Sequence, residues 1–281
     1  MRRRVYAAHG GSRRLLVVDA DTGAIVGQVA VGQVRGVAVD AASGHVYVGT
    51  GDNEVSEIDP AALKVVNHVD VGGSVDAIAY DPSNGRIYAD EDNGTKVWVV
   101  DAKTFKIVKT ITIPGNKPEY LAIDPKTHNV YQNIDNLNEI AVIDAASMSV
   151  SRTIATPEIT HNHPLQFDPA YDQIVVGGTD AADKTKGVLS AYSPDGKKLG
   201  QISTARFDQC DLDLTQHVVA CAGGGGVSRF TLTRGGAPAA LDVTQVNPGV
   251  HTNAIDPKTH AVFTVWADRD GKGDFVQKFN P

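Results

Sequence analysis

Six polar side chains occupy one repeated position in the chain, where each is the last polar residue before a short apolar run that ends in aspartate. They are Arg35, Asp76, Glu119, His163, Asp208 and His251. Imidazole and carboxylate groups bind divalent metal ions, and they also carry protons in general acid and base catalysis. Because the six residues share one position, we predict that they form one candidate catalytic site.

Two imidazoles and up to three carboxylates could hold a divalent metal ion with coordination positions left open. The predicted metal ligands are His163, His251, Asp208, Glu119 and His161. Zinc, copper or calcium would suit such ligands, and the ion would lower the pKa of bound water or polarise a carbonyl group. Without a metal, the same groups could transfer protons, and Arg35 could bind an anionic substrate. A third interpretation is that these are solvated polar side chains without chemistry.

The elements that position these residues follow from a repeat of about 41 to 45 residues. Its marker is the aspartate that closes each apolar run, at Asp40, Asp81, Asp124, Asp168, Asp213 and Asp256. One complete copy contains four short alternating runs, over residues 37–40, 46–49, 55–59 and 65–71, which we interpret as antiparallel strands. A unit of this size cannot bury its own apolar faces, so the copies are expected to stack and close into a ring.

Two of these strands resemble a known repeat. The second strand reads Val46-Tyr47-Val48, Ile87-Tyr88-Ala89 and Val130-Tyr131-Gln132-Asn133 in successive copies. The third reads as an apolar run ending in aspartate over residues 16–19, 55–59, 97–101 and 140–144. Both patterns resemble YVTN-type β-propeller repeats, in particular the YncE-like bacterial propellers, and the resemblance fades after about Thr156. It implies a propeller fold, but propellers host binding proteins, lactonases, lyases and redox enzymes alike.

The number of strands defines the expected architecture. Seven second strands begin near Val5, Val46, Ile87, Val130, Ile174, Val218 and Ala261, but only six inner strands end in the marker aspartate. We therefore predict an all-β, seven-bladed β-propeller in a single domain over residues 1–281. The first blade should lack its inner strand, and the last blade should lack its outer strand.

The resemblance also implies where function lies. In such propellers the loop that enters each inner strand lies at one rim of the central channel, so the six repeated residues are expected there. We favour a protein that binds a small molecule or peptide at this rim, possibly with a metal ion. The alternative is a metal-assisted hydrolase or isomerase, lactonase-like, that uses the same histidines and acids.

The two cysteines can be placed by register. A tight turn centred near residues 215 and 216 pairs positions whose numbers sum to 431, and Cys210 and Cys221 satisfy that sum. They should face each other on adjacent strands, either as a disulfide or as two buried thiols. A disulfide would favour export.

Composition excludes several classes of protein. The net charge is −7, and the 26 Lys and Arg residues are scattered rather than gathered, so no nucleic-acid partner is expected. No apolar run is long enough to span a bilayer, and no signal-peptide core follows Met1. The glycines of residues 222–226 lack the Gly-Lys-Ser/Thr signature of a phosphate loop, so no nucleotide cofactor is expected. We expect a monomer, periplasmic or secreted by family resemblance, with the cytoplasm as the alternative.

A second candidate metal site is the acidic, glycine-containing segment from Asp268 to Asp274. Its alternating carboxylates resemble a calcium-binding loop, although it lacks the length and distant glutamate of an EF-hand. A plain hairpin loop without an ion is the alternative.

Overall fold

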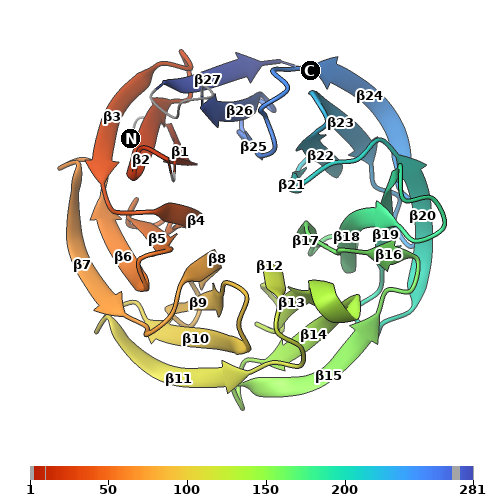
Figure 1. Cartoon of the computed structure of the whole chain (residues 1–281), viewed down its shortest axis with the longest axis horizontal. Coiled ribbons are helices and arrows are strands. Elements are labelled where there is room, and N and C mark those ends of the chain that lie inside the picture. Colours follow the sequence, from red (N-terminus) through yellow and green to blue (C-terminus); the bar gives the residue numbers. More distant parts are fainter. Residues whose placement is uncertain (1–2, 10, 268–272, 281) are drawn as a thin grey trace. The chain divides into compact units, whose positions relative to one another are not determined.

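The computed structural model describes residues 3–9, 11–267 and 273–280, which form an all-β structure of seven antiparallel sheets (Figure 1). Within this part of the chain the single helical element is a short 3-10 turn, η1 (Asp135–Leu137). The chain divides into two compact units, residues 1–136 with 141–153 and residues 137–140 with 154–281. The single domain over residues 1–281 stays a prediction, and each unit is described by itself.

Unit 1 contains three complete sheets and most of a fourth. In chain order their strands are β1 (Arg4–His9), β2 (Arg14–Asp19) and β3 (Ile25–Ala30); β4 (Val34–Val39), β5 (Val46–Thr50), β6 (Glu54–Asp59) and β7 (Lys64–Asp70); β8 (Val75–Asp81), β9 (Arg86–Glu91), β10 (Lys96–Asp101) and β11 (Lys106–Thr112); β12 (Pro118–Ile123), β13 (Val130–Ile134), β14 (Glu139–Asp144) and β15 (Ser149–Ala155). The first two residues of β14 and the last two of β15 belong to unit 2.

Unit 2 contains the other three sheets. Their strands are β16 (Ile159–Thr160), β17 (Leu165–Asp168), β18 (Gln173–Asp180), β19 (Gly187–Tyr192) and β20 (Lys198–Thr204); β21 (Gln209–Asp213), β22 (Val218–Gly223), β23 (Gly226–Thr231) and β24 (Ala239–Gln245); β25 (Asn253–Ile255), β26 (Val262–Ala267) and β27 (Asp274–Phe279). The seven predicted blades are confirmed. Within the described residues the first and last sheets have three strands each, as predicted, but the two-residue strand β16 was not predicted.

Apolar side chains from neighbouring sheets form the core. In unit 1, Tyr47 and Val55 pack with Ile87 and Trp98 of the next sheet, and all four are almost completely buried. In unit 2, Val175 and Leu189 pack in the same way with Val219 and Phe230. Complete burial of such a side chain contributes about 1.5 to 3 kcal/mol, so the sheets are stabilised mainly by their faces.

The repeated aspartates are buried turn caps. Each side chain is at most 9% exposed, and each accepts a hydrogen bond of 2.9 to 3.1 Å from the amide two residues further on. This arrangement closes the tight turn between the first two full-length strands of a blade, because the carboxylate replaces a backbone acceptor. The aspartate pattern is therefore structural, as the sequence indicated.

Three histidines connect these aspartates to the following blade. The Nδ1 atoms of His217 and His260 lie 2.6 Å from Oδ2 of Asp168 and Asp213, and Nδ1 of His128 lies 3.0 Å from Oδ2 of Asp81. Each histidine ends the turn of its own blade with a positive φ, between 54° and 62°. The same carboxylate therefore caps one turn and contacts the next.

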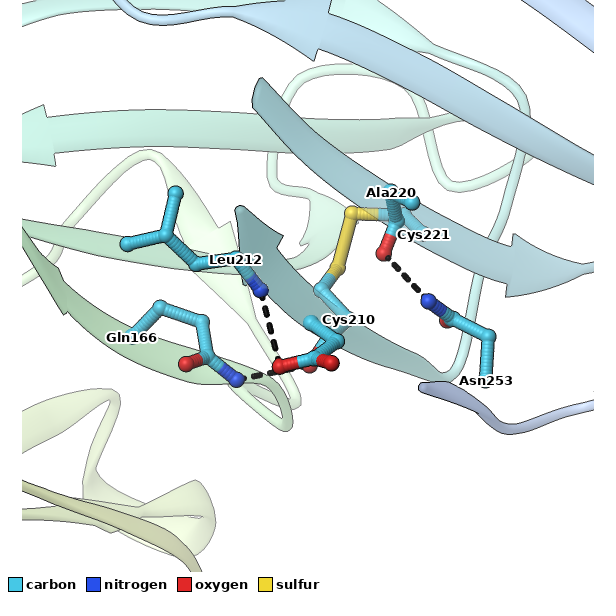
Figure 2. Close-up of a disulfide and its surroundings, with 7 residues drawn as sticks. Gln166, Cys210, Leu212, Ala220, Cys221 and Asn253 are labelled. Carbon is cyan, nitrogen blue, oxygen red and sulfur yellow. Dashed lines mark hydrogen bonds between the residues drawn. A yellow bond between two sulfur atoms is a disulfide. The ribbon is translucent and has the colours of Figure 1, made fainter. Parts of the chain in front are cut away.

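The predicted cysteine register is confirmed. Cys210 pairs with Cys221 across β21 and β22, and a disulfide joins them (Figure 2). Asp213 pairs with Val218, so the connection has four residues rather than the predicted two, with the same register. Figure 2 also shows amide side chains of both neighbouring blades on this hairpin: Gln166 donates to the Cys210 carbonyl at 2.7 Å, and Asn253 donates to that of Ala220 at 3.1 Å.

Replacement of Asp168 tests the role of the buried caps. We expect Asp168→Ala to lower the free energy of unfolding by about 2 to 4 kcal/mol, because it removes the acceptor of Ala170, Tyr171 and His217 from a buried site. Urea denaturation measures the change. The matched control is Asp101→Ala, which removes an exposed turn cap that bonds only within its own turn, to Thr104. Equal losses in the two variants would contradict a special role for the buried aspartate.

Candidate functional site

The six predicted site residues enter their strands in two different ways. His163, Asp208 and His251 precede β17, β21 and β25, as predicted. Their counterparts in unit 1, Arg35, Asp76 and Glu119, are instead the second residues of β4, β8 and β12, so the prediction of a preceding loop was wrong for these three. The two sets belong to different units, and the geometry of each is given separately.

A β-bulge explains the difference in unit 1. Val34 pairs with Thr50 and Val37 with Val48, so Arg35 and Gly36 together face the single residue Gly49. The same register shift occurs in β8 and β12. A bulge redirects the extra side chain, and it places these polar residues at the strand end without ending the strand.

In unit 2 a carboxylate lies between two imidazoles. Asp208 Oδ2 is 3.1 Å from His251 Nδ1, and Asp208 Oδ1 is 3.7 Å from His163 Nε2. The side chains are accessible, with 65% of His251, 43% of Asp208 and 29% of His163 exposed. Three of the six predicted residues are therefore brought together with open access to solvent.

The charges of this group support one another. Burial opposes ionisation of Asp208, but the hydrogen bond from His251 and the nearby His163 outweigh it, so the pKa of Asp208 lies below its ordinary value. The hydrogen bond to Asp208 raises the pKa of His251, and burial and His163 only partly offset it. The arrangement is an anionic carboxylate that orients an imidazole, which is what a hydrogen-bonding or proton-transferring site requires.

Close packing of the backbone positions Asp208. Its amide donates to the carbonyl of Ala222 at 2.8 Å, and the amide of Gln209 donates to that of His251 at 3.2 Å. The preceding residue, Phe207, lies against Gly177, where an added Cβ would be 2.6 Å from the ring. A glycine at position 177 is thus needed for the segment that carries Asp208 to approach the neighbouring blade.

The fourth predicted ligand of unit 2 is His161. It is an exposed residue with φ of 56°, in the bend that follows β16, whereas Asp208 contacts His163 and His251. Its predicted part in metal binding stays a prediction.

In unit 1 the predicted residues pair with charges that the sequence did not indicate. Arg35 Nη1 lies 2.6 Å from Asp92 Oδ2 and 3.4 Å from Asp76 Oδ1. Lys117 contacts Glu119 at 3.3 Å and also Asp135. Asp92 and Asp135 are the first residues after β9 and β13, and this shared position was the signal that could have identified them.

Asp90 is a further acidic residue that lies outside the predicted ring. It is fully buried on β9, where Oδ1 accepts the Ala77 amide of the bulge at 2.6 Å and Oδ2 accepts Gln132 Nε2 at 2.9 Å. Burial raises the pKa of Asp90 well above its ordinary value, and Asp76 and Glu119 raise it further, while the two hydrogen bonds act in the opposite direction. Asp90 therefore keeps its proton to a higher pH than an exposed carboxyl group does, and it supports the bulge that carries Asp76.

Among the described residues, no group of three or more His, Cys, Asp or Glu side chains is arranged to hold a metal ion. Most of the candidate calcium loop from Asp268 to Asp274 lies outside the described residues. Within the part of the chain that the structure describes, no helix is long and apolar enough to cross a membrane.

The titration of His251 tests the charge arrangement of unit 2. In the wild type we expect its pKa above the usual value of about 6.5, and in Asp208→Asn we expect it to fall to about 6.5 or below. Because the pKa of His251 is raised in the folded state, protonation of His251 stabilises the fold at pH values below the pKa of the unfolded state. This stabilisation is lost as the pH rises through the pKa of the folded state. Because the pKa of Asp208 is lowered in the folded state, its ionisation stabilises the fold at pH values above the pKa of the unfolded state. This stabilisation is lost as the pH falls through the pKa of the folded state. The pair should thus stabilise most between about pH 4 and 6.5.

Imidazole proton signals followed by NMR across this range measure the effect. The control is His68→Gln on the exposed strand β7, which should leave the His251 titration unchanged. An unchanged His251 titration in Asp208→Asn would exclude the proposed coupling.

Replacement of Asp90 by asparagine tests the buried proton. A raised carboxyl pKa costs stability progressively as the pH rises from the unfolded value of about 3.9 to the folded value. Asp90→Asn should therefore stabilise the protein at pH 8, by at least about 1 kcal/mol, and give no such gain at pH 4. Asparagine can still accept the Ala77 amide, and rotation of the Gln132 amide would pair its buried Oε1, which has no hydrogen-bond partner.

Urea denaturation at both pH values gives the comparison. Asp90→Ala is the control, because it leaves the Ala77 amide without its acceptor and should destabilise at pH 4 and pH 8 alike. A stability gain of Asp90→Asn that does not depend on pH would show that Asp90 is not protonated.

Comparison with known proteins shows the fold. No protein-family model and no curated protein sequence matches the chain. A solved structure described as Kuenenia stuttgartiensis hydrazine synthase is similar, with a TM-score of 0.83 at 14% sequence identity, over 99% of this chain and 92% of that one. At this identity the similarity shows the fold alone, and with the seven sheets it identifies this chain as a seven-bladed β-propeller.

Proposed function

We propose that this chain is a YVTN-like, YncE-like propeller that binds a small molecule or short peptide at the channel rim. The observation that supports this is the partly exposed carboxylate of Asp208 between the imidazoles of His163 and His251. The group offers acceptor oxygens and imidazole N–H donors side by side, on a backbone fixed by close packing. Such a convergence of polar groups on a rigid support is typical of ligand sites.

A second candidate function is hydrolysis or isomerisation of a lactone-like substrate. It is supported by the Asp208–His251 hydrogen bond, because a carboxylate that orients an imidazole raises its basicity. In such a reaction His251 would accept the proton of an attacking water molecule. A divalent metal ion, zinc, copper or calcium, remains part of this second proposal, and no step is derived through it.

We further propose that the protein works in the periplasm or outside the cell. The Cys210–Cys221 disulfide supports this, since disulfides persist in oxidising compartments.

A binding screen of the purified full chain tests the first proposal. Small molecules and short peptides are screened by thermal shift, and hits are confirmed by calorimetry. We expect Asp208→Asn and His251→Gln each to lower the affinity for a ligand of this site at least about tenfold, because each substitution leaves a polar group of the ligand unpaired. His68→Gln on the exposed strand β7 should change affinity less than about twofold.

The same samples separate the two functions. Bound zinc, copper, calcium and manganese are measured, and turnover is assayed on lactones and esters with and without added metal. Turnover that Asp208→Asn abolishes would favour the enzyme. Ligands that bind equally well to the wild type and both site variants would refute the proposed binding site.

A further inference from the structure

The fifth blade carries a feature that the other described blades lack. The short strand β16 pairs with the end of β18, beyond β17, and places Thr160 directly opposite Thr179. Side chains of directly opposed residues lie on the same face of a sheet, with Cα atoms roughly 4.5 to 5.5 Å apart. The Oγ1 of Thr160 also donates to the carbonyl of Thr179 at 3.3 Å. The two threonines thus form a small polar platform.

Two cationic side chains contact this pair of threonines. Lys184 Nζ lies 2.8 Å from Thr160 Oγ1, and Arg206 Nη2 lies 3.5 Å from Thr179 Oγ1. Lys184 comes from the loop between β18 and β19, and Arg206 precedes β21, so different blades contribute them. Both side chains are exposed.

Neither cation has an anionic partner among the residues that the structure describes. The nearby carboxylates have other contacts: Asp183 pairs with Lys186 at 3.3 Å, and Asp180 accepts the Ala182 amide at 2.8 Å and the Ser203 hydroxyl at 3.3 Å.

The donors that remain match one class of ligand. An ammonium group has three N–H donors and a guanidinium group five, so most of both sets are left over after the threonine contacts. Directed N–H donors with positive charge bind carboxylate and phosphate oxygens most strongly. We propose that Lys184 and Arg206, held against Thr160 and Thr179, form an oxyanion-binding site that takes a carboxylate or phosphate group.

The site adjoins the His163–Asp208–His251 group. Arg206 and Asp208 are separated only by Phe207, and a two-residue extended segment spans roughly 6 to 7 Å. Packing fixes this segment, because the Phe207 ring lies against Gly177 and the Arg206 backbone lies close to Gly187. If the proposed rim function holds, the ligand is a small acid whose anionic end binds Lys184 and Arg206 and whose polar end reaches Asp208.

Titration of the full chain with inorganic phosphate and with succinate tests the oxyanion site by itself. Calorimetry at constant ionic strength keeps general screening equal across samples. We expect saturable binding of at least one anion in the millimolar range or tighter, and the stronger of the two identifies the ligand class. Lys184→Gln and Arg206→Gln should each lower the affinity for that anion at least about tenfold.

Two controls make the result specific. Lys186→Gln removes the same charge from the same loop, but from a lysine paired with Asp183, and should change binding less than about twofold. His68→Gln on the exposed strand β7 should leave the binding of phosphate and succinate intact. The rim proposal is tested by its own screen with Asp208→Asn and His251→Gln, so failure of the rim proposal and failure of the oxyanion site can be distinguished. Absence of saturable binding, or equal losses in Lys184→Gln and Lys186→Gln, would overturn the proposal.

Discussion

The buried aspartate that ends each complete inner strand is the interaction on which the rest of each unit depends. A carboxylate with almost no solvent exposure is stable only if its oxygens are hydrogen-bonded. In Asp168 and Asp213 one oxygen caps the turn and the other accepts a histidine from the next blade. The inner strand is therefore fixed in register at this end. Because the strand is only three to seven residues long, its other end, near the candidate site residue, is fixed as well.

The inner strands approach one another differently in the two units. In unit 1 the approach is direct: a Cβ at Gly36 would lie 2.8 Å from the carbonyl of Asp76 and the amide of Ile78. In unit 2 polar side chains bridge the strands, as Gln166 does to β21 and Asp211 to the Ile255 amide at 2.7 Å. Burial raises the pKa of Asp211 to about 6, although two amides donate to it.

Much of the fold could be predicted from the sequence, because the repeat fixes strand order and a turn fixes register. The pairing of Cys210 with Cys221 followed from the position of one turn alone. The bulge at Arg35 could not be predicted, since it depends on an additional residue facing Gly49 in the partner strand. Asp92 was missed for a related reason: its partner Arg35 comes from a blade 57 positions earlier, and only the stacking of blades brings them together. The strand β16 is two residues long and leaves no periodic signal.

Residue type alone does not identify the site. Asp90 and Asp208 are both aspartates near a predicted site position, yet their surroundings shift their pKa values in opposite directions. Asp90 is buried, and burial together with Asp76 and Glu119 raises its pKa. Asp208 is accessible and lies between two imidazoles, which stabilise its anion. The first carboxyl group can therefore only support the backbone around it, whereas the second can orient a histidine and meet a ligand. This electrostatic difference is the physical reason to assign the ligand site to unit 2.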